Sequence, residues 1–147
     1  MVFRCQDYVM FGDTDASGIG HFAAQVRFLE RAEFYFMDAI GIPPDHPVFR
    51  TVRLPRAHLE VDYTAPVRFG DRLEMTVQVV RIGRTSYTLG IDVFVAPSAV
   101  QAMRTRLVIV AVDPATGRPT PLPDVLVERL SPYLVPARDD TPIPRPS

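Results

Sequence analysis

The stretch from residue 11 to residue 42, FGDTDASGIGHFAAQVRFLERAEFYFMDAIGI, decides the fold of this protein. Its first part, residues 12–18, is rich in glycine, aspartate and serine, a composition typical of a loop. Residues 22–40 contain no proline or glycine, and their apolar side chains recur at spacings of three and four, the period of one helical face. Gly41 and the two prolines soon after it end this pattern. The stretch therefore predicts a loop followed by a helix of about five turns.

Strand-like segments lie on both sides of this predicted helix. Its C-terminal half is apolar on nearly all faces, which is typical of a buried helix. Five segments have the composition of strands: 2–11, 52–63, 71–82, 85–96 and 100–112. We expect the last four to follow one another as an antiparallel meander, with a hairpin turn at Gly83 and Arg84. A buried helix against a long curled sheet is an α+β domain.

Length and composition indicate one small globular domain. The chain has 147 residues and a net charge of −1, and a nucleic-acid-binding protein would usually be more basic. Its single cysteine, Cys5, cannot form an internal disulfide, and no segment approaches the roughly 18 apolar residues of a membrane span. We expect a cytoplasmic single domain over residues 1–135, including a short helix at 124–134, and a proline-rich, disordered tail over residues 136–147.

The loop before the helix carries groups that could act chemically. Asp13, Asp15 and His21 precede the expected start of the helix, whose free backbone N–H groups favour negative charge. A carboxylate there could attack an acyl carbon or activate water, while the amides stabilise the oxyanion. Aspartates in such loops also often only turn the chain or cap a helix, so spacing alone leaves both roles open.

The loop, the helix and a later strand together resemble the 4-hydroxybenzoyl-CoA thioesterase family of hotdog proteins. The family signature is approximately F-x-D-x-D-x-x-G, then a helix, then Y-x-x-P-x-x-x-G-D-x-L. The matching residues are Phe11, Asp13, Asp15 and Gly18 in the loop, Phe28, Glu30, Arg31 and Ala32 in the helix, and Tyr63, Pro66, Gly70, Asp71 and Leu73 after it. The resemblance covers most of residues 3–112. It implies a hotdog fold, in which a curled antiparallel sheet of about five strands wraps a long central helix.

The resemblance also implies a function. Members of this family hydrolyse an acyl-CoA to the free acid and CoA, so CoA would be part of the substrate and neither a cofactor nor a metal is expected. The catalytic carboxylate would be Asp15, acting as nucleophile or general base, and the backbone N–H of Phe22 would be the oxyanion donor. Asp13 would be structural. The acyl group would be aryl, of the hydroxybenzoyl type, or a short or medium aliphatic chain.

Three further loop and helix residues are supporting candidates. Gly18 belongs to the motif, His21 lies close to Asp15 in sequence, and Glu30 occupies a position where some relatives carry an acid that contacts the acyl group. Relatives usually have asparagine at the position of Ala24, where it ties the loop to the helix, so the absence of asparagine here puts the rigidity of the loop in question.

A second group of candidates surrounds the predicted hairpin. Arg81, Arg84 and Ser86 fall where the family binds CoA, and arginine suits phosphate recognition. The chain contains no lysine, so arginine, histidine or backbone amides must hold any anion. The alternative interpretation is that these arginines are solvated charges on a hairpin.

The family resemblance implies a homodimer or a tetramer, with two protomers building each active site. The near-neutral charge and the lack of a long apolar segment predict neither a nucleic-acid nor a membrane partner. Two alternatives remain open at this point. A hotdog hydratase acting on an enoyl thioester would use Asp15 and His21 together, and a non-catalytic module would only bind acyl-CoA or an acyl carrier.

Overall fold

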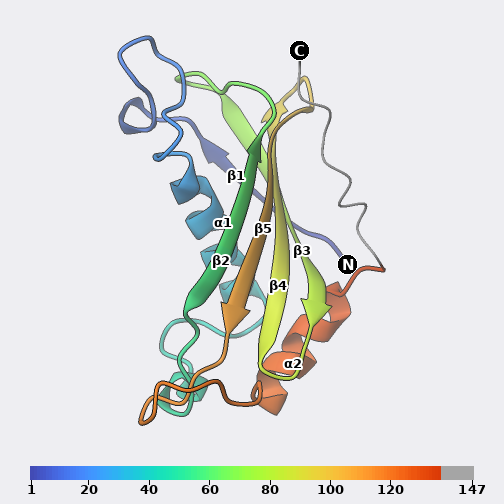
Figure 1. The fold of residues 1–147 in the computed structure, drawn as a ribbon. Helices are drawn as coiled ribbons and strands as arrows, with labels where there is room; N and C mark the ends of the chain where they lie inside the picture. The colour runs from blue at the N-terminus through green and yellow to red at the C-terminus, as the bar shows by residue number, and fades with distance from the viewer. Residues whose placement is uncertain (137–147) are drawn as a thin grey trace.

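The structure is a computed structural model that describes residues 1–136. Helix α1 (Val26–Ala39) lies against one face of a five-stranded antiparallel sheet, as Figure 1 shows. The strands are β1 (Phe3–Tyr8), β2 (Arg56–Tyr63), β3 (Arg72–Ile82), β4 (Ser86–Ala96) and β5 (Val100–Val110). A second helix, α2 (Asp124–Leu130), lies near the turn between β3 and β4. The expected α+β class is therefore what the structure contains.

The strand order is β1-β3-β4-β5-β2, which differs from the expected order at one edge. Strands β3, β4 and β5 form the predicted meander, and the hairpin at Gly83 and Arg84 joins the first two. The prediction that the segment at 52–63 pairs with the next strand was wrong. The free edge of β3 is occupied by β1, so β2 lies at the other edge of the sheet, antiparallel to β5.

Helix α1 begins four residues later than expected. Residues 22–25 form a turn, in which the Gln25 N–H donates to the His21 carbonyl, and the regular helix begins at Val26. The carbonyl of Phe22 accepts a hydrogen bond from the Tyr63 hydroxyl, a contact with the sheet that the spacing of apolar residues cannot reveal. At the other end, Gly41 has φ of +83° and closes the helix as predicted.

Several other predicted ends also shift. The segments predicted to begin at residues 2, 52, 71 and 85 become strands that begin at Phe3, Arg56, Arg72 and Ser86, and the first and last strands end earlier than expected, at Tyr8 and Val110. Before β2 the chain instead forms a 3-10 turn at Pro47–Arg50, and Pro55 precedes the strand. The terminal helix ends at Leu130, and a 3-10 turn that contains Pro132 follows it. Apart from Pro136, the predicted tail lies outside the described residues.

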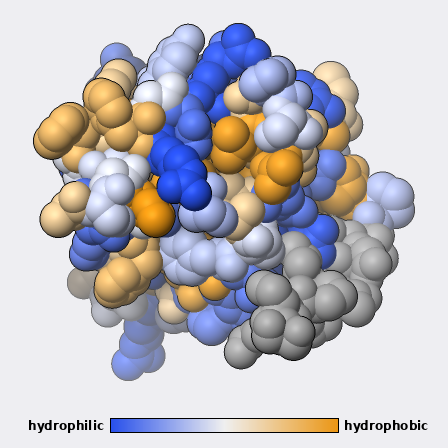
Figure 2. All heavy atoms as spheres, turned by 90° about the horizontal axis from the view of Figure 1, so that it is seen from above, coloured by the Kyte–Doolittle hydropathy of each residue, from blue (hydrophilic) through white to orange (hydrophobic). Residues whose placement is uncertain are grey.

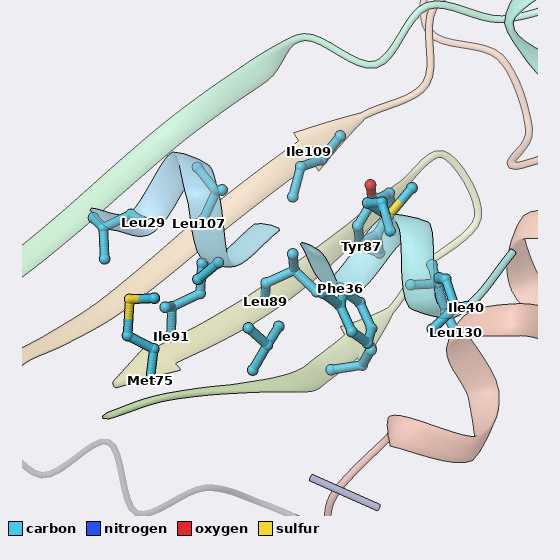
Figure 3. Packing of buried hydrophobic residues seen from close by; sticks show 14 of the residues in the cluster. Leu29, Phe36, Ile40, Met75, Tyr87, Leu89, Ile91, Leu107, Ile109 and Leu130 are labelled. Carbon is cyan, nitrogen blue, oxygen red and sulfur yellow. The ribbon is translucent and has the colours of Figure 1, made fainter. Parts of the chain in front are cut away.

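The core lies between α1 and the inner face of the sheet. Figure 3 shows Leu29 and Phe36 of α1 together with Met75, Leu89 and Ile91 of the central strands. All five side chains are buried. Burying a side chain of this size contributes roughly 1.5–3 kcal/mol, so this layer holds the helix and hence the preceding loop against the sheet. No helix within residues 1–136 is long and apolar enough to cross a membrane.

Candidate active site

The loop between β1 and α1 is held by the buried carboxylate of Asp13. Its Oδ2 accepts from the Met10 N–H at 2.9 Å, and its Oδ1 accepts from the Arg27 guanidinium at 3.0 Å. The same arginine nitrogen donates to the Gly12 carbonyl at 2.9 Å, and the Asp13 carbonyl accepts from the His21 N–H at 2.8 Å. These bonds join the two ends of the loop to each other and to the helix, so Asp13 holds the loop in its conformation.

Asp15 lies two residues later and has the opposite surroundings. Its side chain is exposed. Its Oδ1 accepts from both the Ser17 hydroxyl, at 2.5 Å, and the Ser17 N–H, at 2.8 Å, so neither Ser17 bond uses Oδ2. The Ser17 hydroxyl, followed by the Ser17 and Ile19 amides and the nearby His21, holds the pKa of the Asp15 carboxyl below its ordinary value. The protein therefore presents an ionised carboxylate to solvent.

His21 and Phe22 lie between this carboxylate and the helix. The His21 Nδ1 accepts from the Ala23 N–H at 3.2 Å, and the two aromatic rings stack with centroids 4.9 Å apart. The Tyr63 hydroxyl fixes the Phe22 carbonyl at 2.5 Å. Within residues 1–136 the Phe22 N–H has no acceptor, and it belongs to the turn before α1 rather than to the first turn of a regular helix. The expected donor is thus available, although the predicted helix start was wrong.

Two glycines and a buried glutamine fix the middle of the loop. Gly18 has φ of +80°, a conformation that favours glycine, and its carbonyl accepts from the Phe69 N–H. A Cβ on Gly20 would come within 2.5 Å of the Val67 side chain, so only glycine lets the loop backbone lie this close to Val67. The Gln25 Nε2 donates to the Gly20 carbonyl at 3.1 Å. Gln25 thereby ties the loop to the helix although Ala24 replaces the usual asparagine.

The expected CoA-binding residues lie at the other end of the same protomer. Arg81 and Arg84 are exposed at the β3–β4 hairpin, and Ser86 is half-buried beside them. The Asp15 loop instead lies near the start of β3, where Ile19 bridges to Arg68. From Arg72 to Arg81 is nine strand residues, or roughly 30 Å. Figure 1 shows the loop at the top and the hairpin at the bottom, so one protomer does not bring these two groups together.

A groove of about 780 Å³ lies between α1 and the edge strand β2. Glu30, the expected acyl-contacting acid, is exposed on its helix wall. The groove extends from Val26, one turn beyond Phe22, to Ile42 after the end of α1. The structure therefore places Glu30 on a concave, mostly apolar surface that begins one turn beyond Phe22.

Aromatic side chains surround the Asp15 loop on the outside. Phe11 packs edge-on against Phe69 with ring centroids 5.2 Å apart, and both rings are exposed. Phe22 is 68% exposed. Figure 2, which looks onto this end of the molecule, shows apolar side chains lying beside hydrophilic ones on the open surface. This end of the protomer thus leaves apolar area uncovered.

Comparisons with known proteins assign the chain to a family. The model of the thioesterase-like superfamily matches residues 9–130, and the chain belongs to that superfamily. A solved 1,4-dihydroxy-2-naphthoyl-CoA thioesterase from Synechocystis superposes with a TM-score of 0.83 at 20% identity, over 89% of this chain and 96% of that one. The predictions of a hotdog fold and of a thioester hydrolase are confirmed.

Two named relatives are similar in sequence over most of their length. The 1,4-dihydroxy-2-naphthoyl-CoA hydrolase of Synechococcus elongatus is 30% identical over 131 residues, which cover 87% of this chain and 94% of that protein. The acyl-CoA thioester hydrolase YbgC of Escherichia coli is 27% identical over 126 residues, which cover 86% of this chain and 93% of that protein. The resemblance therefore extends through the sheet and is not confined to the loop motif.

Sequence reasoning missed several residues that shape the site. The roles of Arg27 and Gln25 depend on contacts with a loop whose path is not visible in the sequence. The ion pair between Glu33 and Arg56, which line the groove from α1 and β2, could not be predicted because the two residues are 23 positions apart in the sequence. A polar residue on the buried face of a predicted helix was the only available signal for Glu33 and Gln25.

Replacing Asp13 with asparagine is expected to destabilise the fold. The asparagine amide would leave the Arg27 guanidinium without its carboxylate and lose a charge-assisted bond, at a cost of roughly 2 kcal/mol. Denaturant unfolding measures this change. The matched control Asp45→Asn removes an exposed carboxylate and should change stability by no more than about 0.5 kcal/mol. Equal stability of the two variants would contradict the structural role of Asp13.

Replacing Ser17 with alanine is expected to move the acid limb of the kcat/KM profile to higher pH. The hydroxyl is the largest cause that lowers the pKa of Asp15, so its removal raises that pKa toward the ordinary value. A carboxylate acts only when ionised, so activity is then lost at a higher pH as the solution is acidified. An unchanged acid limb in Ser17→Ala would show that another group controls it.

Proposed function

We propose that this protein is an acyl-CoA thioesterase that hydrolyses an acyl-CoA to the free acid and CoA. The observation that carries the proposal is the exposed, ionised carboxylate of Asp15. It is held on a hydrogen-bonded loop that leads to Phe22, whose backbone N–H has no acceptor among the described residues. The relatives named as CoA thioester hydrolases support the same reaction.

The proposed mechanism assigns one role to each group. Asp15 either attacks the thioester carbon, forming an anhydride that water then hydrolyses, or removes a proton from an attacking water. In both routes the carbon–oxygen bond forms, the carbon–sulfur bond breaks, and CoA leaves as a thiol after taking up a proton. The Phe22 N–H donates to the developing oxyanion. The low pKa of Asp15 keeps the carboxylate ready without any prior proton transfer.

The proposed acyl group is aryl, with a short or medium aliphatic chain as the second choice. Relatives are named for dihydroxynaphthoyl-CoA, which carries a compact bicyclic acyl group. The groove that begins at Val26 has an apolar lining, and such a lining suits a ring or an alkyl chain. Glu30 on its wall offers an acceptor for a hydroxyl substituent.

The proposed enzyme is a homodimer in which each site contains parts of two protomers. Arg81 and Arg84 lie roughly 30 Å from the start of β3, too far to contact a CoA held at the Asp15 loop of their own protomer. Strand β2 is an edge strand with exposed Leu59 and Tyr63, and an exposed edge of this kind is a template for pairing with another chain. Antiparallel pairing of two β2 edges would turn the second copy end over end, so that its hairpin arginines face the Asp15 end of the first. Association of two such dimers into a tetramer is compatible with this arrangement.

Replacing Asp15 with asparagine is expected to abolish hydrolysis. The amide preserves the shape but cannot attack or accept the proton, and such losses commonly cost several powers of ten in rate. The assay monitors free thiol released from 4-hydroxybenzoyl-CoA and from aliphatic acyl-CoAs, with CoA affinity measured in parallel. Turnover above about a tenth of the wild-type value would show that Asp15 is not the catalytic group. A change in an enoyl-CoA substrate without thiol release would instead favour the hydratase.

A further inference from the structure

The groove beside α1 is interrupted by an ion pair. Glu33 lies on the helix wall and Arg56 on the β2 wall, and both line the groove. The Arg56 Nε donates to Glu33 Oε2 at 3.2 Å, its Nη2 donates to Glu33 Oε1, and its Nη1 donates to the Leu54 carbonyl at 2.7 Å. The glutamate side chain is 7% exposed and the arginine 49% exposed. The pair is therefore fixed from both walls at once.

Mostly apolar residues line the groove on both sides of this pair, with Glu30 on the near side. Val26 and Leu29 precede Glu33 along α1, whereas Met37 follows it and Phe49 lines the far part of the groove. The near part begins at Val26, one turn beyond Phe22, and the far part lies beyond the charges. From Val26 to Glu33 is seven helix residues, or roughly 10 Å along the helix axis. The near part is thus long enough for a bicyclic ring or a medium alkyl chain.

We propose that the Glu33–Arg56 pair sets the length of acyl group that the enzyme accepts. This inference rests on the proposed function, because it needs the acyl group to enter the groove from the Asp15 loop. The near part of the groove, up to Glu33, binds the acyl group. The ion pair ends this apolar stretch, and longer chains are discriminated against at that point.

The energetic reason is that an alkyl chain gains more from contact with the apolar walls than from contact with the charged Glu33–Arg56 pair. Each methylene that enters apolar surroundings contributes about 0.8 kcal/mol. A methylene laid against Arg56 contributes less, and it also removes water from a guanidinium that is half exposed and has N–H groups left over from its three bonds. Affinity should therefore rise with chain length only until the chain reaches the pair.

The chain-length profile of kcat/KM tests the proposal. Wild-type protein is assayed with butyryl-, hexanoyl-, octanoyl-, lauroyl- and palmitoyl-CoA and with 4-hydroxybenzoyl-CoA as a compact reference. The double variant Glu33→Met/Arg56→Met removes both charges together, so neither is left buried without its partner, and methionine fills the space flexibly. The ratio of palmitoyl to butyryl kcat/KM should rise at least about tenfold in the double variant.

A matched control removes an ion pair from α1 that does not line the groove. Asp7→Asn/Arg31→Gln breaks the partly buried contact between Arg31 and Asp7 and should leave the ratio unchanged. An unchanged ratio in Glu33→Met/Arg56→Met, or an equal rise in the control, would overturn the proposal. If the double variant fails to fold, the wild-type profile decides, because kcat/KM that keeps rising to palmitoyl-CoA contradicts a stop at Glu33.

The same profile separates this inference from the proposed function. Absence of hydrolysis with every thioester would refute the thioesterase itself. Hydrolysis of all chain lengths alike would refute only the length limit. A second copy whose side chains fill the groove would also refute the limit, because the double variant would then change dimer stability and leave the substrate profile unaltered.

Discussion

The buried carboxylate of Asp13 is the interaction on which the candidate site depends. It accepts from the Met10 N–H before the loop and from Arg27 after it, while its own carbonyl receives the His21 N–H. A charged group this deeply buried is stable only when it is fully bonded, so the ends of the loop have little freedom to separate. The consequence is that Asp15, two residues further on, projects outward from a closed loop and does not have to be ordered when substrate binds.

Two aspartates of one motif thus have separate tasks because their surroundings differ. Asp13 uses its charge to hold the backbone, and Asp15 keeps its charge available because Ser17 and the loop amides lower its pKa. The remaining parts of the proposed site are spread along the protomer. The groove lies between α1 and β2, and the loop lies near the start of β3. The hairpin arginines lie at the opposite end of β3, which is why the proposed enzyme needs a second copy.

The loop and the helix could be predicted from the sequence because their signals are local. Glycine and aspartate spacing located the loop at residues 12–18, and the apolar period located the helix. The predicted helix start was wrong because two contacts override the helical preference of residues 22–25. The Phe22 carbonyl accepts from the Tyr63 hydroxyl, and the Gln25 side chain donates to the Gly20 carbonyl. The edge position of β2 and the pairing of Glu33 with Arg56 were not predictable, since both join segments that no periodic pattern relates.

The most direct measurement of the central claim is the activity of mixed dimers. One subunit carries Asp15→Asn, the other carries Arg81→Ala/Arg84→Ala, and acyl-CoA is supplied below the wild-type KM. If Asp15 of one protomer works with the arginines of the other, each mixed dimer contains one intact site and should show about half of the wild-type activity. If each site instead belongs to a single protomer, no mixed dimer has an intact site. Activity no higher than half that of the Arg81→Ala/Arg84→Ala homodimer would then contradict the two-protomer site.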